Sequence, residues 1–503
     1  MSKLIIDRRE FLRYLGISTV SILGHQLLSA CAPLFSGQPT NEPFGEPDVE
    51  VQLFAKTDLQ QIFPGNPTKV WRYQGEVIKG SSDALRFLPD SYLGPIFQVN
   101  KGMHVRVHFT NDLPETTIIH WHGLHVPESA DGHPRLAIEN GETYVYDFKV
   151  MDRAGTYWYH PHPHGRTGPQ VYQGLAGLFL IHDDEETSLS LPSNEKDLPL
   201  VIQDRYFDSD NQLVYDPSVM GMFGNRILVN GIPDFKFEVD RAAYRLRLMN
   251  GSNARIYKLA WDDGSPLHVI GTEGGLLEQP LIRDYITLAP AQRVELWVDF
   301  GLWDSGDIIN LISLTEAGDA VDFPIFSAVI NNSDRLVTSL PDQLTIHDPL
   351  NASQAVNANN PRVFEMQMGM GMRWMFNGRV FEMMDVARNE KVRLDDIEIW
   401  EFYNPGRSGM GMPGMIQPHP IHIHGLQFKI LERQVDSSSV ISYSNLKDGF
   451  VDEGWHDTVL VVPGERVRLL MQFKDFNGLY LYHCHNLEHE DMGMMRNYQV
   501  LSA

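Results

Sequence analysis

The sequence predicts an all-β protein built from sandwich or barrel domains. Short segments such as GMHVRVHFTND and ETYVYDFKV alternate β-branched or aromatic residues with polar ones, which is the period of a strand with one buried face. Turn signals such as Asn-Asp, Asp-Gly and Pro-Gly separate these segments. Long helical periodicity is scarce. Together these observations favour layered β domains over helical or mixed folds.

Two polar stretches indicate domain boundaries. One is the acidic run from His182 to Asp197, and the other is the long segment 338–361. They divide the chain that follows a Pro/Gly-rich spacer into three parts of ordinary domain size. We therefore expect domains at 48–185, 196–337 and 362–503, with a surface linker at 338–361.

The first 35 residues are typical of an export signal. Arg8 and Arg9 precede Phe11 and Leu12, and a modest apolar stretch follows, running to LLSAC. This resembles a twin-arginine signal, whose export machinery carries proteins that have already folded. The four residues from Leu28 to Cys31 also resemble a lipobox, so a lipid anchor at Cys31 and simple cleavage remain alternatives. The signal predicts a periplasmic or cell-envelope protein. No other apolar run reaches about 18 residues, so no further segment is expected to span a membrane.

Composition excludes some partners. A formal net charge of -24 argues against nucleic acid, because an acidic surface repels phosphates. The only two cysteines, Cys31 and Cys484, have such different surroundings that a disulfide between them is not expected. We expect a monomer.

Four His-x-His pairs carry the chemistry. Residues two apart on a strand project from the same face, so each pair can offer two imidazoles to one point. Eight imidazoles exceed what one four-coordinate ion takes, which predicts a metal cluster. The pairs are split evenly between the first and third parts of the chain: His120 and His122, His160 and His162, His422 and His424, His483 and His485.

Cys484 lies between two of these histidines and must point to the opposite face of the strand. There it can meet His489, Met494 and, from the motif MIQPHPIHIHG, His419. A thiolate, two imidazoles and a weak axial thioether make the trigonal site of electron-transfer copper. Zinc also binds Cys and His, but a redox-inert ion has no use for the axial methionine or for a covalent bridge to a neighbouring site.

With these motifs the sequence resembles the multicopper oxidases, the family of laccases, bilirubin oxidases and bacterial cuprous oxidases. The resemblance rests on HWHGLH, WYHPHPHG, HPIHIHG and HCHNLEHEDMGMM, and it spans essentially the whole mature chain. It implies three cupredoxin-like Greek-key domains and four copper ions, one of type 1 in the third domain and a type 2 and type 3 cluster between the first and third.

The resemblance also implies the ligands. Those of type 1 are His419, Cys484, His489 and Met494, and those of type 2 are His120 and His422. Those of the type 3 pair are His122, His160, His162, His424, His483 and His485.

Two acids match positions at which the family handles protons. Asp131 lies eleven residues after His120, and Glu490 directly follows His489. Reducing dioxygen to water consumes protons, so buried carboxylates with a raised pKa would suit the reaction. A solvated Asp-Gly turn is the alternative for Asp131. Three neighbours of the motifs are expected to have other roles: His125 and His164 as structural or ligand-supporting residues, and Trp121 as core.

Methionines bear on the electron donor. Half of the 20 lie between Met366 and Met415. Soft thioethers select monovalent copper, which favours cuprous ion as the donor. Filling irregular core space is the alternative, and without the Met/His-rich insertion of copper-efflux members, phenolic donors stay open. The two runs concerned are Met366, Met368, Met370 and Met372, expected on one strand face and mainly in the core, and Met410, Met412 and Met415, just before His419.

The leading interpretation is an exported oxidase that couples one-electron oxidation of a small reductant to the four-electron reduction of dioxygen to water. A copper nitrite reductase would not need eight cluster imidazoles. A copper-sequestering protein would explain the methionines but not the Cys-bridged strand, and a non-catalytic scaffold of the same fold is disfavoured by the complete ligand set.

Overall fold

The computed structural model describes residues 45–315, 322–369, 371–405, 417–436 and 440–502. The predicted export signal with Cys31, and also Met370, Met410, Met412 and Met415, lie outside the described residues. None of the helices in the described part of the chain has the length and apolarity that a membrane crossing requires.

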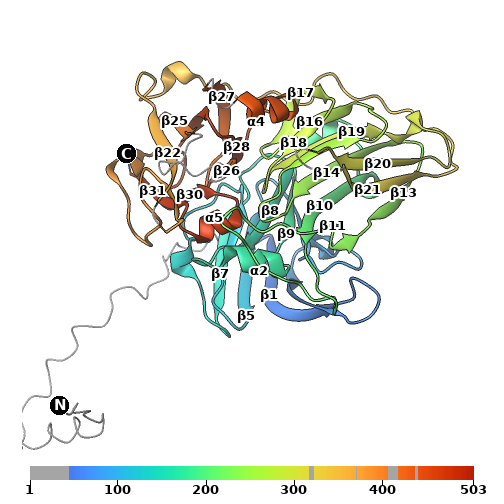
Figure 1. Ribbon diagram of the computed structural model, residues 1–503, viewed down its shortest axis with the longest axis horizontal. Coiled ribbons are helices and arrows are strands. Elements are labelled where there is room, and N and C mark those ends of the chain that lie inside the picture. The colour runs from blue at the N-terminus through green and yellow to red at the C-terminus, as the bar shows by residue number, and fades with distance from the viewer. Residues whose placement is uncertain (1–44, 316–321, 370, 406–416, 437–439, 503) are drawn as a thin grey trace, which may run out of the picture. The chain divides into compact units, whose positions relative to one another are not determined.

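Strands dominate the described chain, and they form six sheets. Pairs of sheets share one hydrophobic core each, which gives three sandwiches at residues 49–182, 197–330 and 362–501 (Figure 1). The all-β prediction is confirmed. Each sandwich lies inside one predicted domain range, while the domain boundaries themselves stay a prediction.

The first sandwich packs a four-stranded sheet on a five-stranded one (Figure 1, blue to cyan). The first eight residues of strand β1, which lies between β2 and β5, alternate between buried and half-buried, as the period-two pattern predicts. The four-stranded sheet holds β2 (Thr68–Lys79), β1 (Val49–Gln60), β5 (His104–Asp112) and β7 (Thr143–Lys149). The five-stranded sheet holds β3 (Leu85–Arg86), β4 (Ile96–Asn100), β9 (Gly177–His182), β8 (Gly155–Pro161) and β6 (Ile119–His122).

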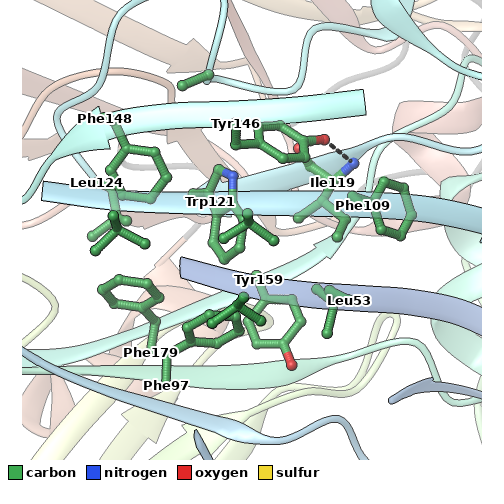
Figure 2. Packing of buried hydrophobic residues seen from close by; sticks show 14 of the residues in the cluster. Leu53, Phe97, Phe109, Ile119, Trp121, Leu124, Tyr146, Phe148, Tyr159 and Phe179 are labelled. Atoms are coloured by element: carbon green, nitrogen blue, oxygen red, sulfur yellow. Dashed lines mark hydrogen bonds between the residues drawn. The ribbon is translucent and has the colours of Figure 1, made fainter. Parts of the chain in front are cut away.

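Aromatic side chains fill the core of this sandwich (Figure 2). Trp121 is fully buried against the rings of Phe97, Tyr146 and Tyr159, so its assignment to the core is confirmed. The Tyr146 hydroxyl accepts a hydrogen bond from the Ile119 amide at 2.8 Å. This contact holds β6, the strand that carries the first two histidines, against the opposite sheet.

The second and third sandwiches repeat the arrangement (Figure 1, green to yellow and orange to red). The second consists of β12 (Ile232–Pro233), β11 (Arg226–Val229), β10 (Asp197–Arg205), β14 (Ala243–Asn250), β19 (Arg293–Asp299), β16 (Leu267–Thr272) and β17 (Gly275–Arg283), facing β13 (Lys236–Val239), β21 (Phe323–Ile330), β20 (Ile308–Ser313), β15 (Tyr257–Trp261) and β18 (Ile286–Leu288). The third consists of β23 (Trp374–Phe376), β22 (Arg362–Met368), β25 (Ile397–Asn404), β29 (Glu465–Gln472) and β27 (Phe428–Val435), facing β24 (Lys391–Arg393), β31 (Met495–Leu501), β30 (Gly478–Cys484), β26 (His419–Ile423) and β28 (Thr458–Val461).

Short helices connect the strands: α2 (Thr167–Gln173), α3 (Asp184–Ser188), α4 (Val440–Leu446) and α5 (Leu487–Asp491). Helix α5 of the third sandwich lies beside α2 of the first (Figure 1). The Asp491 carboxylate accepts from the backbone amides of Thr167 and Gly168 at 2.9 and 2.8 Å. These contacts join the two sandwiches next to the predicted ligands.

Two sequence-based expectations need correction. The segment 338–361 is not a surface linker throughout, because Leu344 is buried in the core of the second sandwich and His347 Nε2 hydrogen-bonds the Leu276 carbonyl at 2.9 Å. The Met366–Met372 run is not one strand face, because β22 ends at Met368 and Met372 is 53% exposed with a φ of 58°. Among the described methionines of this run, Met366 is fully in the core and Met368 is partly buried against it.

Candidate metal centre

Strand register brings the His-x-His pairs together. In the first sandwich β6 and β8 are antiparallel neighbours, and His120 lies opposite His160. In the third sandwich β26 and β30 are antiparallel neighbours, and His422 lies opposite His483. The second member of each pair is on the same strand or directly beyond its end, and all eight imidazoles are buried.

The eight imidazoles form three groups, and each group contains histidines from both the first and the third sandwich. In the smallest, His120 Nε2 lies 3.2 Å from His422 Nε2. In the second, His160 Nε2 lies 3.4 Å from His122 Nδ1 and 3.5 Å from His485 Nε2. Imidazole nitrogens bound at about 2 Å to a shared ion would stand roughly this far apart.

The third group is similar. His483 Nε2 lies 3.0 Å from His424 Nε2 and 3.4 Å from His162 Nε2. The three groups coincide with the type 2 and type 3 ligand sets that the family resemblance implies. The predicted convergence of four pairs on one cluster is therefore what the structure shows.

Burial disfavours the charged form of four of these imidazoles. Desolvation, followed by repulsion from neighbouring imidazoles, lowers the pKa of His120, His122, His160 and His424 well below that of a free histidine. A neutral imidazole has a lone pair available for a metal ion.

Hydrogen bonds at the other ring nitrogen select which atom faces the cluster. His120 Nδ1 donates to the Asp131 carbonyl at 2.6 Å, and His422 Nδ1 donates to the Asp457 carbonyl at 2.8 Å. His424 Nδ1 contacts Asp131 Oδ2 at 2.9 Å. In each case Nε2 keeps the lone pair and points into the cluster. His122 is reversed, with Nε2 on Asp457 Oδ1 at 3.0 Å and Nδ1 inward.

The two predicted acids both adjoin cluster histidines. Asp131 is fully buried, and its Oδ1 has no hydrogen-bond partner, so it is not the solvated turn of the alternative interpretation. Burial, with repulsion from Glu128, raises the pKa of Asp131 well above its usual value. Glu490 differs from the expectation of a raised pKa. Its Oε2 lies 3.1 Å from His483 Nδ1, and although burial opposes ionisation, His483 and His162 lower its pKa.

Cys484 lies on the other face of β30 from His483, as its position between two histidines predicts. Its Sγ is 3.4 Å from His419 Nδ1 and 3.7 Å from His489 Nδ1, and these two nitrogens are 3.2 Å apart. All three side chains are buried. Burial raises the pKa of the Cys484 thiol, so in the metal-free chain it is protonated, and a bound cation would be needed to form the thiolate.

Met494 is held next to this group by its backbone. Its carbonyl accepts from the Cys484 amide at 3.0 Å, and its amide donates to the His489 carbonyl at 2.9 Å. The side chain is fully buried. Its role as an axial ligand stays a prediction.

A cavity of about 500 Å³ lies beside the Cys484 group. Trp374 connects the two: its ring packs on His419 and His489 at 4.7 and 4.5 Å, and its Nε1 donates at 3.2 Å to the carbonyl of Val219, a residue that lines the cavity. The wall includes His164, Met372, Phe381, Asp491 and Met492.

Sequence reasoning missed three residues of the site: Trp374, Asp457 and Arg293. Asp457 and Arg293 lie outside every histidine motif, in different sandwiches, and only tertiary structure joins them to His122. His125, expected to be structural or ligand-supporting, is structural: it joins the Gly425 carbonyl at 2.6 Å and Asp475 Oδ2 at 2.9 Å. His164 lines the cavity instead of contacting a ligand.

Comparison with known proteins agrees with this geometry. Family sequence profiles described as multicopper oxidase match residues 71–186 and 355–503. A laccase of Bacillus stratosphericus is 30% identical over 86% of this chain and 91% of its own, and the multicopper oxidase mco of Staphylococcus aureus is 32% identical over 86% and 87%. Among solved structures, the multicopper oxidase McoA of Aquifex aeolicus matches with a TM-score of 0.76 at 35% identity, covering 90% of this chain and 96% of that one.

Proposed function

Because this chain belongs to the multicopper oxidase family, and is therefore a copper-dependent oxidoreductase, we propose that it couples one-electron oxidation of a small reductant to the reduction of dioxygen to water. One observation carries the proposal. The consecutive residues His483, Cys484 and His485 place a thiol among two histidines on one face and two imidazoles in the cluster on the other.

The donor set fits four copper ions. Three buried groups of imidazoles suit divalent copper, and a thiol with two imidazoles and a nearby thioether is the donor set of an electron-transfer copper site. When bound, copper supplies one-electron acceptance at the Cys484 group and dioxygen reduction at the cluster. The ligands proposed for these ions are those that the family resemblance implies. We propose domains at 48–185, 196–337 and 362–503, of which the first and the third carry these ligands.

The chain provides the path between the two sites. His483 and His485 are bonded through the backbone to Cys484, so an electron that reaches its sulfur is one residue from two cluster imidazoles. The antiparallel pairing of β30 with β26 and β31 keeps this segment rigid. Cys484 is thus the residue on which transfer between the sites depends.

Asp131 is placed to hold a proton for the reaction, and Glu490, whose pKa is lowered, is placed as a carboxylate that can accept one. Reducing one dioxygen to two waters consumes four electrons from the reductant and four protons. Asp131, with an unpartnered Oδ1 and a raised pKa, can hold a proton at the cluster. Glu490 accepts a hydrogen bond from Thr167 Oγ1 at 2.7 Å and lies close to His483. His483 belongs to the same imidazole group as His424, which contacts Asp131.

The reductant is proposed to bind in the cavity beside Trp374. A volume of about 500 Å³ suits a small molecule. Two thioethers in its wall, those of Met372 and Met492, favour cuprous ion. The Phe381 ring and its apolar neighbours would equally accept a phenol, so both donors belong to the proposal.

Export through the twin-arginine machinery is part of the proposal. Arg8 and Arg9 support it, and Cys31 would anchor the mature chain in the cell envelope if it is acylated. Replacing both arginines by Lys should leave the precursor in the cytoplasm, and efficient export of that variant would remove the twin-arginine route.

Metal analysis combined with oxygen uptake tests the enzyme. We expect about four coppers per monomeric chain and oxygen consumption driven by cuprous ion or a methoxyphenol. Cys484→Ser should lose the blue colour and the uptake but keep the cluster copper, whereas Cys31→Ser, at the only other cysteine, should keep all three. Copper binding without oxygen uptake would indicate a copper-sequestering protein. The absence of both copper binding and oxygen uptake would indicate a scaffold.

A further inference from the structure

Among the described residues, the second sandwich contributes no member of the metal-ligand groups, yet it reaches the cluster through the buried side chain of Arg293. Arg293, the first residue of β19, is fully buried and extends to Asp457 of the third sandwich. Its Nη1 donates to Asp457 Oδ1 at 2.9 Å and its Nη2 to Oδ2 at 2.5 Å. This is the two-pronged pairing that fixes a carboxylate most firmly in position.

The guanidinium has no spare donor. Its remaining N–H groups are taken by three backbone carbonyls: Nε donates to Thr156 at 2.9 Å, Nη1 to Ala291 at 3.0 Å and Nη2 to Glu273 at 3.4 Å. All five N–H groups of the side chain are therefore bonded. Arg293 is held rigidly and can in turn hold Asp457.

Asp457 in turn holds two cluster histidines in position by hydrogen bonds. Its Oδ1 accepts from His122 Nε2 at 3.0 Å, and its backbone carbonyl accepts from His422 Nδ1 at 2.8 Å. The two imidazoles stack on one another at 3.6 Å with 14° between their planes. The Asp457 carboxylate also accepts from Thr458 Oγ1 at 2.8 Å.

Gly123 supplies an independent sign that the ion pair is built into the site. It directly follows His122 and has a φ of +88°. A Cβ there would lie 2.4 Å from Asp457 Oδ2 and 2.8 Å from Arg293 Nη2. The turn after His122 thus leaves room for the Asp457–Arg293 pair only because it has no side chain.

We infer that Arg293 is a positioning residue for the metal cluster: by holding Asp457 against Nε2 of His122, it makes Nδ1 the metal-binding atom of that histidine. This explains why His122 is reversed relative to His120, His422 and His424. It also gives the second sandwich a function at the cluster. The inference rests on the proposed metal cluster.

The test compares Arg293→Met with Arg247→Met in copper-loaded protein. Arg247 is a matched control: it is in the same sandwich, is equally buried, and pairs with Glu295 and Asp197, but it contacts no histidine of the site. We expect Arg293→Met to release cluster copper to a chelator about 10- to 100-fold more readily, as is typical when a ligand loses its supporting hydrogen-bond partner. The colour of the Cys484 site should remain. Arg247→Met should unfold at lower temperature with its copper ratio unchanged.

Two further variants keep the test decisive. Arg293→Lys should recover part of the copper retention, because a single ammonium keeps the charge without the two-pronged geometry. If Arg293→Met does not fold, the double variant Arg293→Met with Asp457→Asn removes both charges and should still lose cluster copper. Wild-type copper retention in Arg293→Met, or in that double variant, would overturn the inference. Absence of cluster copper from the unmodified chain would instead contradict the proposed function.

Discussion

The surroundings of Asp131 and of Asp457 differ in one respect that decides what each carboxylate can do. Both are fully buried, and both contact two cluster histidines through the side chain and the backbone carbonyl. Asp457 is paired with Arg293, and Asp131 has no cation within bonding distance. Burial raises the pKa of Asp131, whereas in Asp457 the guanidinium and His422 outweigh burial and lower the pKa.

The same contact therefore serves two purposes. A carboxyl group that can exist with or without its proton suits proton transfer, and a permanently paired carboxylate suits the positioning of a ligand. The presence of one arginine, supplied by a sandwich without ligands, makes the difference. Substitutions on the two sides should consequently fail in different ways.

The largest effect is expected for Asp131→Asn. The amide keeps the size of the side chain but cannot release a proton, so oxygen reduction should fall by about 10²- to 10⁴-fold for every reductant alike. Copper content should stay at the wild-type value. Oxygen uptake with cuprous ion and with a phenol, alongside metal analysis, measures both. Loss of copper in this variant would mean that Asp131 positions ligands in the same way as Asp457.

Asp457→Asn should show the opposite pattern. Copper should leave the cluster about 10- to 100-fold more readily, while the rate per fully loaded chain changes little. The variant should also be less stable, because Arg293 is left as an unpaired buried charge. Chelator titration followed by the rate of the reloaded protein tests this. A rate loss at full copper content would place Asp457 in the proton path.

The different roles of Asp131 and Asp457 could not be derived from the sequence. The four His-x-His pairs predict a cluster because a strand places residues two apart on one face, and the structure confirms that reasoning. Asp131 was found because it lies close to a motif. Asp457 and Arg293 are 164 residues apart and have no motif. Their pairing depends on how the second and third sandwiches pack, which strand periodicity does not reveal.

The surface linker prediction needs a qualification for a related reason. The segment 338–361 has the polar composition of a loop, but Leu344 and His347 find partners in the second sandwich. Local composition reports the average solvent exposure of a segment. It does not report which single residues are captured by a neighbouring core.

Glycine substitutions next to Asp131 and next to His122 should also affect stability and copper retention differently, with smaller effects than the aspartate variants. Gly132, next to Asp131, has a φ of +83°, and a Cβ there would meet the backbone carbonyl oxygen of Ile119 at 2.0 Å. Gly132→Ala should destabilise the fold by at least about 1–3 kcal/mol, because the backbone cannot give way. A Cβ at Gly123 would meet side-chain atoms, which can move. Gly123→Ala should therefore lower the stability of the fold less than Gly132→Ala does, but it should lose more copper from the cluster. Equal copper retention in both variants would contradict the role given to the Asp457–Arg293 pair.

The smallest effect concerns the pH dependence of stability on the Asp457 side. His456, adjacent to Asp457, is buried, and its Nδ1 lies 2.6 Å from Glu273 Oε2. Burial lowers its pKa, but the charges of Glu273 and Asp452 and a bond to the Glu453 carbonyl outweigh it, so the pKa of His456 is raised. A histidine whose pKa is raised on folding stabilises the protein below the pKa of the unfolded state, about 6.5, and loses that contribution as pH rises through the pKa of the folded state.

Glu273→Gln should therefore cost more stability at pH 6 than at a pH well above the pKa of His456 in the folded state. Denaturant unfolding across this range measures it, with Glu238→Gln on an exposed site of β13 as control. A deficit that is constant with pH would mean that His456 stays neutral in the folded protein.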